Sequence, residues 1–362
     1  EKGYIGGVES RNRVAMTARG NGLASTEMTK EEIGYIIKKF VAAAVNCQKA
    51  GIDGVELHAA HGYLLGSFIS PYTNKRTDEY GGSVQNCCRI VTEIINGIRA
   101  ACGRYPICVR INGSDFVEGG ITLAYAVEVA KTLEAAGADA LNVSCAVYET
   151  VPNMIEPNYY EEGWRKELAK TVKAHVKIPV IAVNTIKFPA TAEKLLEEGV
   201  SDFVGVSRGQ MADPEWVNKA RAGREDLIRK CMGCMQCNKS VVQDGYLSCA
   251  ANPVTGRGTM YNDEYLIRSG AGRNVVVIGG GPAGMQAAIT LAKRAFHVIL
   301  LEQKSYLGGM AYLATVPPHK TMVAEFIKTL EAEMKELGVD VRMNVTADVA
   351  TVKALEPYAV VV

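Results

Sequence analysis

The sequence GVELHAAHGYLLGSFISPYTNKRTDEYGGS, residues 54–83, decides how the rest of the chain is organised. It opens with an alternation in which Val55 and Leu57 fall on one side of an extended chain and Glu56 and His58 fall on the other. This pattern is typical of a half-buried strand. The alternation ends at the glycine that follows the second histidine, and a polar loop comes later. The stretch therefore predicts a strand whose C-terminal end carries polar side chains.

Three side chains that form hydrogen bonds or transfer protons, His58, His61 and Tyr63, lie within six residues at this strand end. In a parallel α/β barrel, catalytic groups lie at the C-terminal ends of the strands. A histidine near a strand nevertheless often packs in the core or lies on the surface. The two histidines also lack a third ligand at metal-binding spacing. The local pattern therefore leaves catalysis and ordinary packing both open.

Length and composition are those of an ordinary globular protein. The 362 residues predict two or three domains of about 150 residues each. The chain is 48% hydrophobic and 22% charged, and its formal net charge is +1. Since Lys and Arg are spread along the sequence, nothing favours nucleic acid or a membrane surface as a partner. No apolar run approaches the roughly 18 residues of a transmembrane helix, and no signal peptide is apparent.

Helical and extended patterns alternate through the first part of the chain. A helical pattern at 29–50 precedes the first quoted strand, and further helical patterns cover 84–102, 122–136, 164–175 and 189–198. Besides the quoted strand, extended patterns fall before, between and after these helices, at 11–18, 107–112, 140–144, 179–183 and 203–207. Repeated βα units predict parallel strands with right-handed crossovers. The strands number six, whereas a closed (β/α)8 TIM barrel needs eight, so we expect about two βα units to be missing.

The second part of the chain carries a glycine motif. An apolar run, residues 274–278, reads as a buried parallel strand, and Gly279, Gly281 and Gly284 follow it in GxGxxG spacing. The next predicted strand ends at Glu302. A bare GxGxxG is weak evidence, because it also marks an ordinary tight turn. With its strand, helix and acidic residue in place it indicates a Rossmann-like dinucleotide fold, in which the glycines approach a pyrophosphate and Glu302 holds the ribose.

Four clustered cysteines lie between these parts, at Cys231, Cys234, Cys237 and Cys249. Three tightly spaced thiolates and a fourth after a short loop suit a [4Fe–4S] cluster. Structural zinc is the alternative, and its two Cys-x2-Cys pairs usually lie about 15–20 residues apart. The third cysteine of the run makes zinc the less favoured metal. The other cysteines are scattered, which is typical of free thiols in a reducing cytoplasm, so we expect a cytoplasmic protein.

Two motifs carry a family resemblance. HAAHGYLL followed by TNKRTDEYGGS resembles the old yellow enzyme family of FMN-dependent ene-reductases. CMGCMQC followed by SCAANP is similar to iron–sulfur members, which include trimethylamine dehydrogenase, the dienoyl-CoA reductases and the clostridial enoate reductases. The resemblance covers nearly the whole chain. It implies an FMN-binding barrel at 1–225, a [4Fe–4S] segment at 226–262 and the N-terminal part of an FAD/NAD(P)-binding domain at 263–362.

The resemblance also assigns roles to individual residues. Arg110, in VRINGSDF, matches an arginine that faces the flavin, and Arg208 matches one that binds its phosphate. Asn184 lies in the preceding phosphate loop, at a place where glycine is commoner. Gly309 ends a glycine pair typical of an FAD-binding fold. The plainer interpretations are a surface ion pair for either arginine and an ordinary turn for Gly309.

The implied reaction is reduction of an activated alkene. NAD(P)H would reduce FAD, the cluster would pass single electrons, and FMN would deliver hydride to the β-carbon of the substrate. His58 and His61 would donate hydrogen bonds to the substrate oxygen, and Tyr63 would protonate the α-carbon. The histidine pair resembles enone and enoate reductases, so we expect a 2-enoate or a 3-oxo-Δ4 steroid or bile acid.

Other functions stay open at this point. One alternative is an amine dehydrogenase or a dienoyl-CoA reductase of the same family. Another is a non-catalytic fragment that binds FAD and a cluster and passes electrons to a partner. The sequence leaves the choice between NADH and NADPH open, and it leaves open whether the protein is a homo-oligomer.

Overall fold

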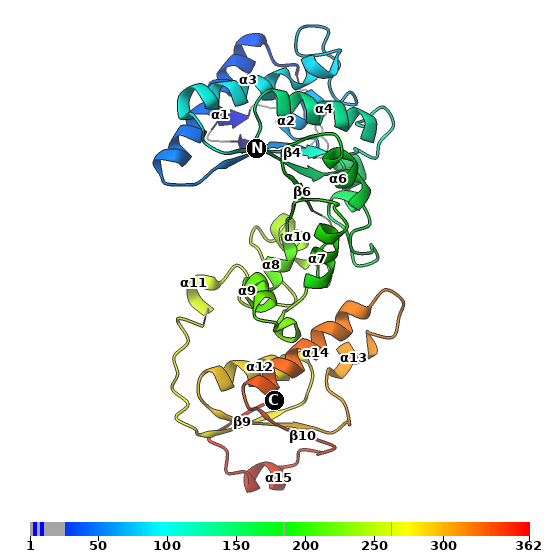
Figure 1. The fold of residues 1–362 in the computed structure, drawn as a ribbon. Helices are drawn as coiled ribbons and strands as arrows, with labels where there is room; N and C mark the ends of the chain where they lie inside the picture. The colour runs from blue at the N-terminus through cyan, green and yellow to red at the C-terminus, as the bar shows by residue number, and fades with distance from the viewer. Residues whose placement is uncertain (1–2, 6–7, 11–25, 184, 262) are drawn as a thin grey trace. The chain divides into compact units, whose positions relative to one another are not determined.

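The computed structural model describes residues 3–5, 8–10, 26–183, 185–261 and 263–362 (Figure 1). The strand expected at 11–18 and the predicted phosphate-loop residue Asn184 lie outside the described residues. The chain forms two compact units. The first comprises Glu1–Glu156, Glu161–Ile186 and Ala190–Gly205, and the second comprises Pro157–Tyr160, Lys187–Pro189 and Val206–Val362.

A parallel sheet forms the centre of the first unit. Its strands are hydrogen-bonded in chain order, which is β3 (Val55–Ala59), β4 (Ile107–Asn112), β5 (Ala140–Ser144), β6 (Val180–Ala182) and β7 (Phe203–Val204). Each strand lies where the alternating patterns predicted one. A separate antiparallel pair, β1 (Gly3–Ile5) and β2 (Val8–Ser10), precedes the sheet. The parallel α/β class is therefore confirmed, with five parallel strands in the described part of the first unit instead of the eight of a closed barrel.

Helices between the strands cover the outer face of this sheet, as the periodicity predicted. They are α1 (Lys30–Lys49), α3 (Val84–Cys102), α4 (Leu123–Ala135), α6 (Lys166–Lys173) and α7 (Pro189–Glu197). Thr29 and Glu32 begin α1 as a capping box, in which the Thr29 hydroxyl accepts from the Glu32 amide at 3.2 Å. Along α3, one face is fully buried at Ile90, Ile94, Ile95 and Ile98.

Shorter helices lie in the loops. Two follow β5, the 3-10 helix η1 (Tyr148–Thr150) and α5 (Val151–Met154). One that the sequence did not predict, α2 (Leu64–Ile69), follows β3 directly, and all its side chains are buried. Its LLGSFI sequence is apolar on every side, so it has no helical periodicity to detect. The helix matters for the site, because Tyr63 occupies the position just before its first turn.

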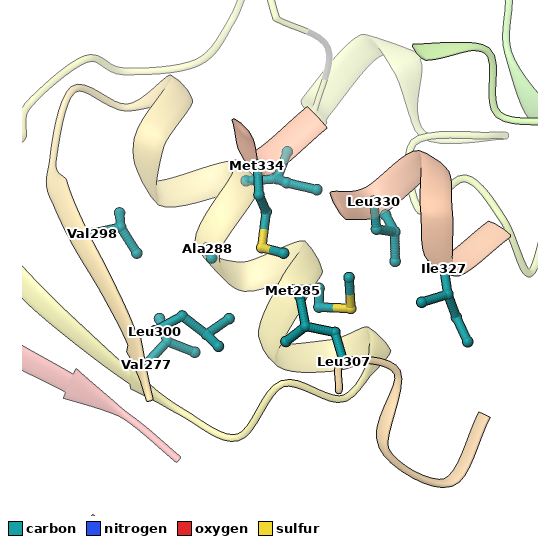
Figure 2. Close-up of a cluster of buried hydrophobic side chains, with 10 residues drawn as sticks. Val277, Met285, Ala288, Val298, Leu300, Leu307, Ile327, Leu330 and Met334 are labelled. Carbon is teal, nitrogen blue, oxygen red and sulfur yellow. The ribbon is translucent and has the colours of Figure 1, made fainter. Parts of the chain in front are cut away.

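A second parallel sheet organises the C-terminal part of the second unit. Its strand order is β10-β9-β8-β11, with β8 (Asn274–Ile278), β9 (His297–Glu302), β10 (Asp340–Met343) and β11 (Ala359–Val361). Two helices, α12 (Pro282–Lys293) and α14 (Thr321–Glu336), pack on it. Figure 2 shows their shared core, where Met285 of α12, Leu300 of β9 and Leu330 of α14 come together. This strand order is that of a Rossmann-type fold, as the glycine motif predicted.

The cysteine segment belongs to the same unit as this second sheet. The unit's smaller helices are α8 (Arg208–Ala212), α9 (Trp216–Arg221), η2 (Glu225–Leu227), α10 (Gln236–Gln243), α11 (Gly258–Tyr261), α13 (Gly309–Leu313) and α15 (Val349–Ala354). Arg229 of this segment pairs with Glu333 of α14 through two contacts, at 2.5 and 2.7 Å. Both side chains are nearly buried, so the pair holds the segment against α14. None of the helices in the described residues is long and apolar enough to span a bilayer.

Candidate active site and cofactor sites

The three side chains predicted to carry the chemistry come together at the end of β3. The ring centroids of His58 and His61 are 5.1 Å apart, and those of His58 and Tyr63 are also 5.1 Å apart. His61 is buried, whereas 39% of Tyr63 is exposed. The structure therefore places two imidazoles and a phenol in one cluster at the C-terminal edge of the sheet, where a small molecule can reach the phenol.

Backbone geometry explains how His61 reaches the cluster. Its φ of 61° lies in the left-handed region, and Gly62 follows with a φ of 71°. Asn112, at the end of β4, accepts a hydrogen bond from the His61 amide at 3.2 Å, and His61 Nε2 lies 2.7 Å from Ser144 Oγ at the end of β5. Two neighbouring strands thus hold this histidine in a conformation that non-glycine residues seldom adopt.

Arg110 lies on the same face of the sheet as His58. The two residues are paired across β3 and β4, and Arg110 is paired in turn with Asn142 of β5. Its Nη2 donates to Ser144 Oγ at 3.3 Å. Within the described residues, Arg110 Nε and His58 Nδ1 are buried and make no hydrogen bond. Buried polar nitrogens without partners are costly, so the site suits a ligand that brings acceptors to this face.

Burial and the nearby guanidinium keep both histidines neutral. Desolvation lowers the pKa of His61 from 6.5 to about 3, and the positive charge of Arg110 adds to the effect. The pKa of His58 is lowered by the same two causes in the same order, against a smaller opposing effect of Glu56. A neutral imidazole retains one N–H and can donate a hydrogen bond without carrying charge.

A buried polar network that the sequence analysis did not single out supports the cluster. Asp115 is fully buried, and its carboxylate accepts from Ser70 Oγ at 2.6 Å, Asn112 Nδ2 at 2.7 Å and the Ile121 amide at 2.9 Å. Asn112 also donates to the carbonyl of Ala146 at 2.9 Å. The carboxylate therefore connects the end of β4 with the loop after α2 and the loop before α4, and Asn112 extends the network to the loop after β5. Its place within the VRINGSDF motif was the available sequence signal.

The four clustered cysteines line one pocket in the second unit. Its lining comes from within residues 231–237 and 249–251, which include Cys231, Cys234, Cys237 and Cys249, and from Arg208. Met235 adopts a left-handed conformation with a φ of 65°, which turns the chain between the second and third cysteines. In the described residues, no group of three or more His, Cys, Asp or Glu has the geometry of a single-ion site. Four thiols around one pocket are a donor set that fits an iron–sulfur cluster.

Arg208 lies in this cysteine pocket, which the sequence did not predict. It begins α8 after the β7 strand, and its Nη1 lies 3.9 Å from Met235 Sδ. The resemblance had assigned this arginine to the FMN phosphate. That role stays a prediction, and the contact with the cysteine segment is additional to it.

The glycine motif forms a turn between β8 and α12, and a different structural cause favours glycine at each of its three positions. Gly279 has a φ of 101°, which side chains rarely adopt. A Cβ at Gly284 would meet the Gly279 carbonyl oxygen at 2.0 Å, so the helix packs closely on the turn. A Cβ at Gly281 would meet nothing within 4 Å, and the space beside it is open. This open space at a helix N-terminus suits a pyrophosphate.

The acidic residue lies against the same turn. Glu302 Oε2 accepts from the Gly280 amide at 2.7 Å, and Oε1 accepts from the Lys304 amide at 2.8 Å. Gly309 also lies against this turn, since a Cβ at Gly309 would come within 3.1 Å of Gly281 Cα. Helix α12 begins at Pro282, so Gly284 lies inside its first turn.

Comparisons with known proteins agree with this architecture. Residues 7–227 match the family model described as NADH:flavin oxidoreductase / NADH oxidase family, and residues 274–357 match the model described as FAD dependent oxidoreductase. The chain is 48% identical over 343 residues to the NADH oxidase of Thermoanaerobacter brockii, covering 94% of this chain and 52% of that protein. It is 33% identical over 349 residues to the cinnamate reductase of Clostridium sporogenes, covering 92% and 52%.

A solved structure shows the same fold over nearly the whole chain. The 2-naphthoyl-CoA reductase in complex with 2-naphthoyl-CoA superposes with a TM-score of 0.91 at 32% identity, covering 99% of this chain and 56% of that one. The chain thus spans about half the length of the relatives it matches. The match to the first family model covers more than half of the sequence and includes the histidine cluster and the parallel sheet. The chain therefore belongs to the NADH:flavin oxidoreductase / NADH oxidase family.

Proposed function

We propose that the protein reduces the C=C bond of an α,β-unsaturated carbonyl compound with electrons from NAD(P)H. The substrate class is a 2-enoate or a 3-oxo-Δ4 steroid or bile acid. The observation that carries the proposal is the cluster of His58, His61 and Tyr63 at the end of β3, with both histidines neutral. Such a cluster can bind a carbonyl oxygen and deliver a proton to the same molecule.

Three cofactors fit the residues present. FMN would lie against His58 and Arg110, where buried nitrogens lack acceptors, and Asn184 and Arg208 are assigned to its phosphate. A [4Fe–4S] cluster would be held by Cys231, Cys234, Cys237 and Cys249. FAD would lie on the glycine turn, with Gly279, Gly281, Gly284, Glu302 and Gly309 around it. When bound, these groups supply electron transfer from NAD(P)H and hydride for the substrate.

The chain's own residues would bind and orient the substrate. Ser144 Oγ accepts from Arg110 Nη2 and lies 2.7 Å from His61 Nε2, so in this role its own proton would go to Nε2. The neutral His61 ring would then carry its proton on Nδ1. With His58 it donates hydrogen bonds to the substrate oxygen and stabilises the charge that develops there. Tyr63, the exposed member of the cluster, gives its proton to the α-carbon.

The decisive experiment is anaerobic turnover by the full-length protein with cinnamate, a 3-oxo-Δ4 steroid and trimethylamine as separate substrates. We expect alkene reduction, and we expect His58→Ala and His61→Ala each to lower kcat/KM on the order of 100-fold. His175→Ala is the matched control, because His175 lies exposed in the same unit on the outer side of the sheet. Amine oxidation without alkene reduction would refute the proposal.

Cofactor analysis separates this proposal from an electron-transfer role. Extracted flavin is quantified as FMN and FAD per chain, together with iron. About one FMN per chain is expected of a reductase of this family. FAD and iron without FMN would instead favour a protein that passes electrons to a partner.

A further inference from the structure

A second phenol stands beside the proposed proton donor. Tyr148 begins η1, in the loop that follows β5. Its ring centroid lies 5.6 Å from that of Tyr63, and the ring planes meet at 75°. This is an edge-to-face contact between two rings that are both partly exposed, at 39% and 43%. Nothing in the sequence analysis gave Tyr148 a role, because it comes 85 residues after Tyr63 in the chain.

The loop that carries Tyr148 is anchored to the buried network of the site. Thr150 Oγ1 accepts from the Val147 amide at 3.1 Å and donates to the Asp115 carbonyl at 2.8 Å. Asn112, which holds the His61 amide, also donates to the Ala146 carbonyl. The histidine turn and the Tyr148 loop therefore both rest on the Asn112 side chain, which the buried Asp115 carboxylate holds in place. The two phenols are consequently positioned by one support.

We propose that Tyr148 is a positioning residue for proton donation by Tyr63, with its hydroxyl donating a hydrogen bond to the Tyr63 oxygen. This inference rests on the proposed function. When bound, reduced FMN would supply hydride to the β-carbon, and the π electrons of the C=C bond would move toward the carbonyl. The Tyr63 O–H bond then breaks, and its proton forms the C–H bond at the α-carbon. The resulting Tyr63 phenolate accepts the Tyr148 hydrogen bond and regains its proton from water through Tyr148.

The electrostatics of the pair agree with this direction of donation. Burial raises the pKa of Tyr148 above its ordinary value, and interaction with the Tyr63 hydroxyl raises that pKa further. Tyr148 therefore stays protonated, and available as a donor, while Tyr63 gives up its proton. A hydrogen bond to an ionised oxygen is roughly twice as strong as one between neutral groups. The contact thus stabilises the state in which Tyr63 has lost its proton.

Kinetics of the full-length holoprotein test the role. We expect Tyr148→Phe to lower kcat for cinnamate about tenfold with KM changed less than about twofold, and to increase the solvent deuterium isotope effect on kcat. Tyr63→Phe should cost on the order of 100-fold. The double variant should be no slower than Tyr63→Phe alone, because Tyr148 acts through Tyr63. Tyr35→Phe, on the exposed face of α1, is the matched control.

Two outcomes would overturn the inference. One is a double variant whose loss is the product of the two single losses, since independent residues add in free energy. The other is a Tyr148→Phe variant that changes KM alone, which would make Tyr148 a contact of the substrate only.

A second measurement is independent of turnover. The protein is labelled with 3-fluorotyrosine, and the Tyr63 fluorine resonance is identified by its loss in Tyr63→Phe. It should shift in Tyr148→Phe and stay in place in Tyr35→Phe. An unchanged resonance would show that the hydroxyls do not interact. If the wild-type protein reduces no unsaturated carbonyl compound, the proposed function fails, and the fluorine spectra still decide whether the two phenols are coupled.

Discussion

At the scale of single residues, His61 makes the folded chain sensitive to acid. Its pKa falls from 6.5 to about 3 on folding, chiefly because burial disfavours the charged ring. The folded state therefore binds the proton more weakly than the unfolded state does. The resulting stabilisation is complete above about pH 6.5 and is lost as the pH falls toward 3. Between about pH 7.5 and about pH 5, the free energy of unfolding should fall by about 2 kcal/mol from this residue.

Urea unfolding of the flavin-free protein measures this effect. Of the two tryptophans, Trp164 lies in the first unit, so its fluorescence reports that unit once Trp216 has been replaced by Phe. The free energy of unfolding is compared at about pH 7.5 and about pH 5. In His61→Asn, the difference between these two free energies should be about 2 kcal/mol smaller than in the parent, whereas in His175→Asn it should be unchanged. A His61 variant with the pH dependence of the parent would show that the buried ring is not the group responsible.

The candidate residues fall into two groups: those that a short stretch of sequence predicts and those that only the fold brings together. His58, His61 and Tyr63 were predictable, because they are neighbours in sequence and follow one recognisable strand. Tyr148 and Asp115 were not, since each acts through contacts between loops that only the register of β3, β4 and β5 brings together. A buried aspartate that accepts hydrogen bonds from three segments has no periodic pattern to reveal it.

At the scale of elements, two glycines of the turn between β8 and α12 have different roles: Gly284 allows close packing, and Gly281 leaves space for a ligand. Gly284→Ala should lower the free energy of unfolding by about 1–3 kcal/mol, because its methyl group would meet the Gly279 carbonyl oxygen. Gly281→Ala should change stability by only a few tenths of a kcal/mol, because it caps the helix with an ordinary φ of −74° and open space around it. The same methyl group should nevertheless weaken FAD binding, because it occupies the space assigned to the pyrophosphate.

Thermal unfolding and FAD content, measured on both variants, check this contrast. Gly258→Ala, at the start of α11, is the control, because a Cβ there also meets nothing within 4 Å and its φ is not positive. If Gly281→Ala retains FAD as firmly as the parent, the pyrophosphate does not lie on this turn.

The elements themselves were largely predictable. The helix expected at 84–102 is α3 and the strand expected at 107–112 is β4, since each has a clean period and a cap or turn at its ends. Helix α12 begins at Pro282 because Gly281 serves as its N-cap, a role that the motif alone does not reveal. The short helix α2 went unpredicted because a fully buried helix has no polar face.

At the scale of the whole molecule, the cysteine pocket predicts a metal content. We propose the division into 1–225, 226–262 and 263–362, with the middle segment as the cluster site. Protein purified without oxygen should contain about four iron and four sulfide ions per chain. Cys234→Ser should lose most of both, and Cys47→Ser, on α1, should lose neither. One zinc per chain without sulfide would contradict the cluster and restore the alternative that the spacing left open.

The second unit includes two loops that come from within the sequence of the first, Pro157–Tyr160 and Lys187–Pro189. Asn158 donates to the His319 carbonyl at 2.8 Å, the Lys187 carbonyl accepts from the Trp216 indole at 3.2 Å, and the Lys230 ammonium lies 5.2 Å from the centre of the Phe188 ring. In a chain that ends at residue 205, these two loops would lose their contacts with His319, Trp216 and Lys230. We therefore expect a gene fragment for the first unit alone to yield aggregated material, and co-expression with the remaining polypeptide to restore it.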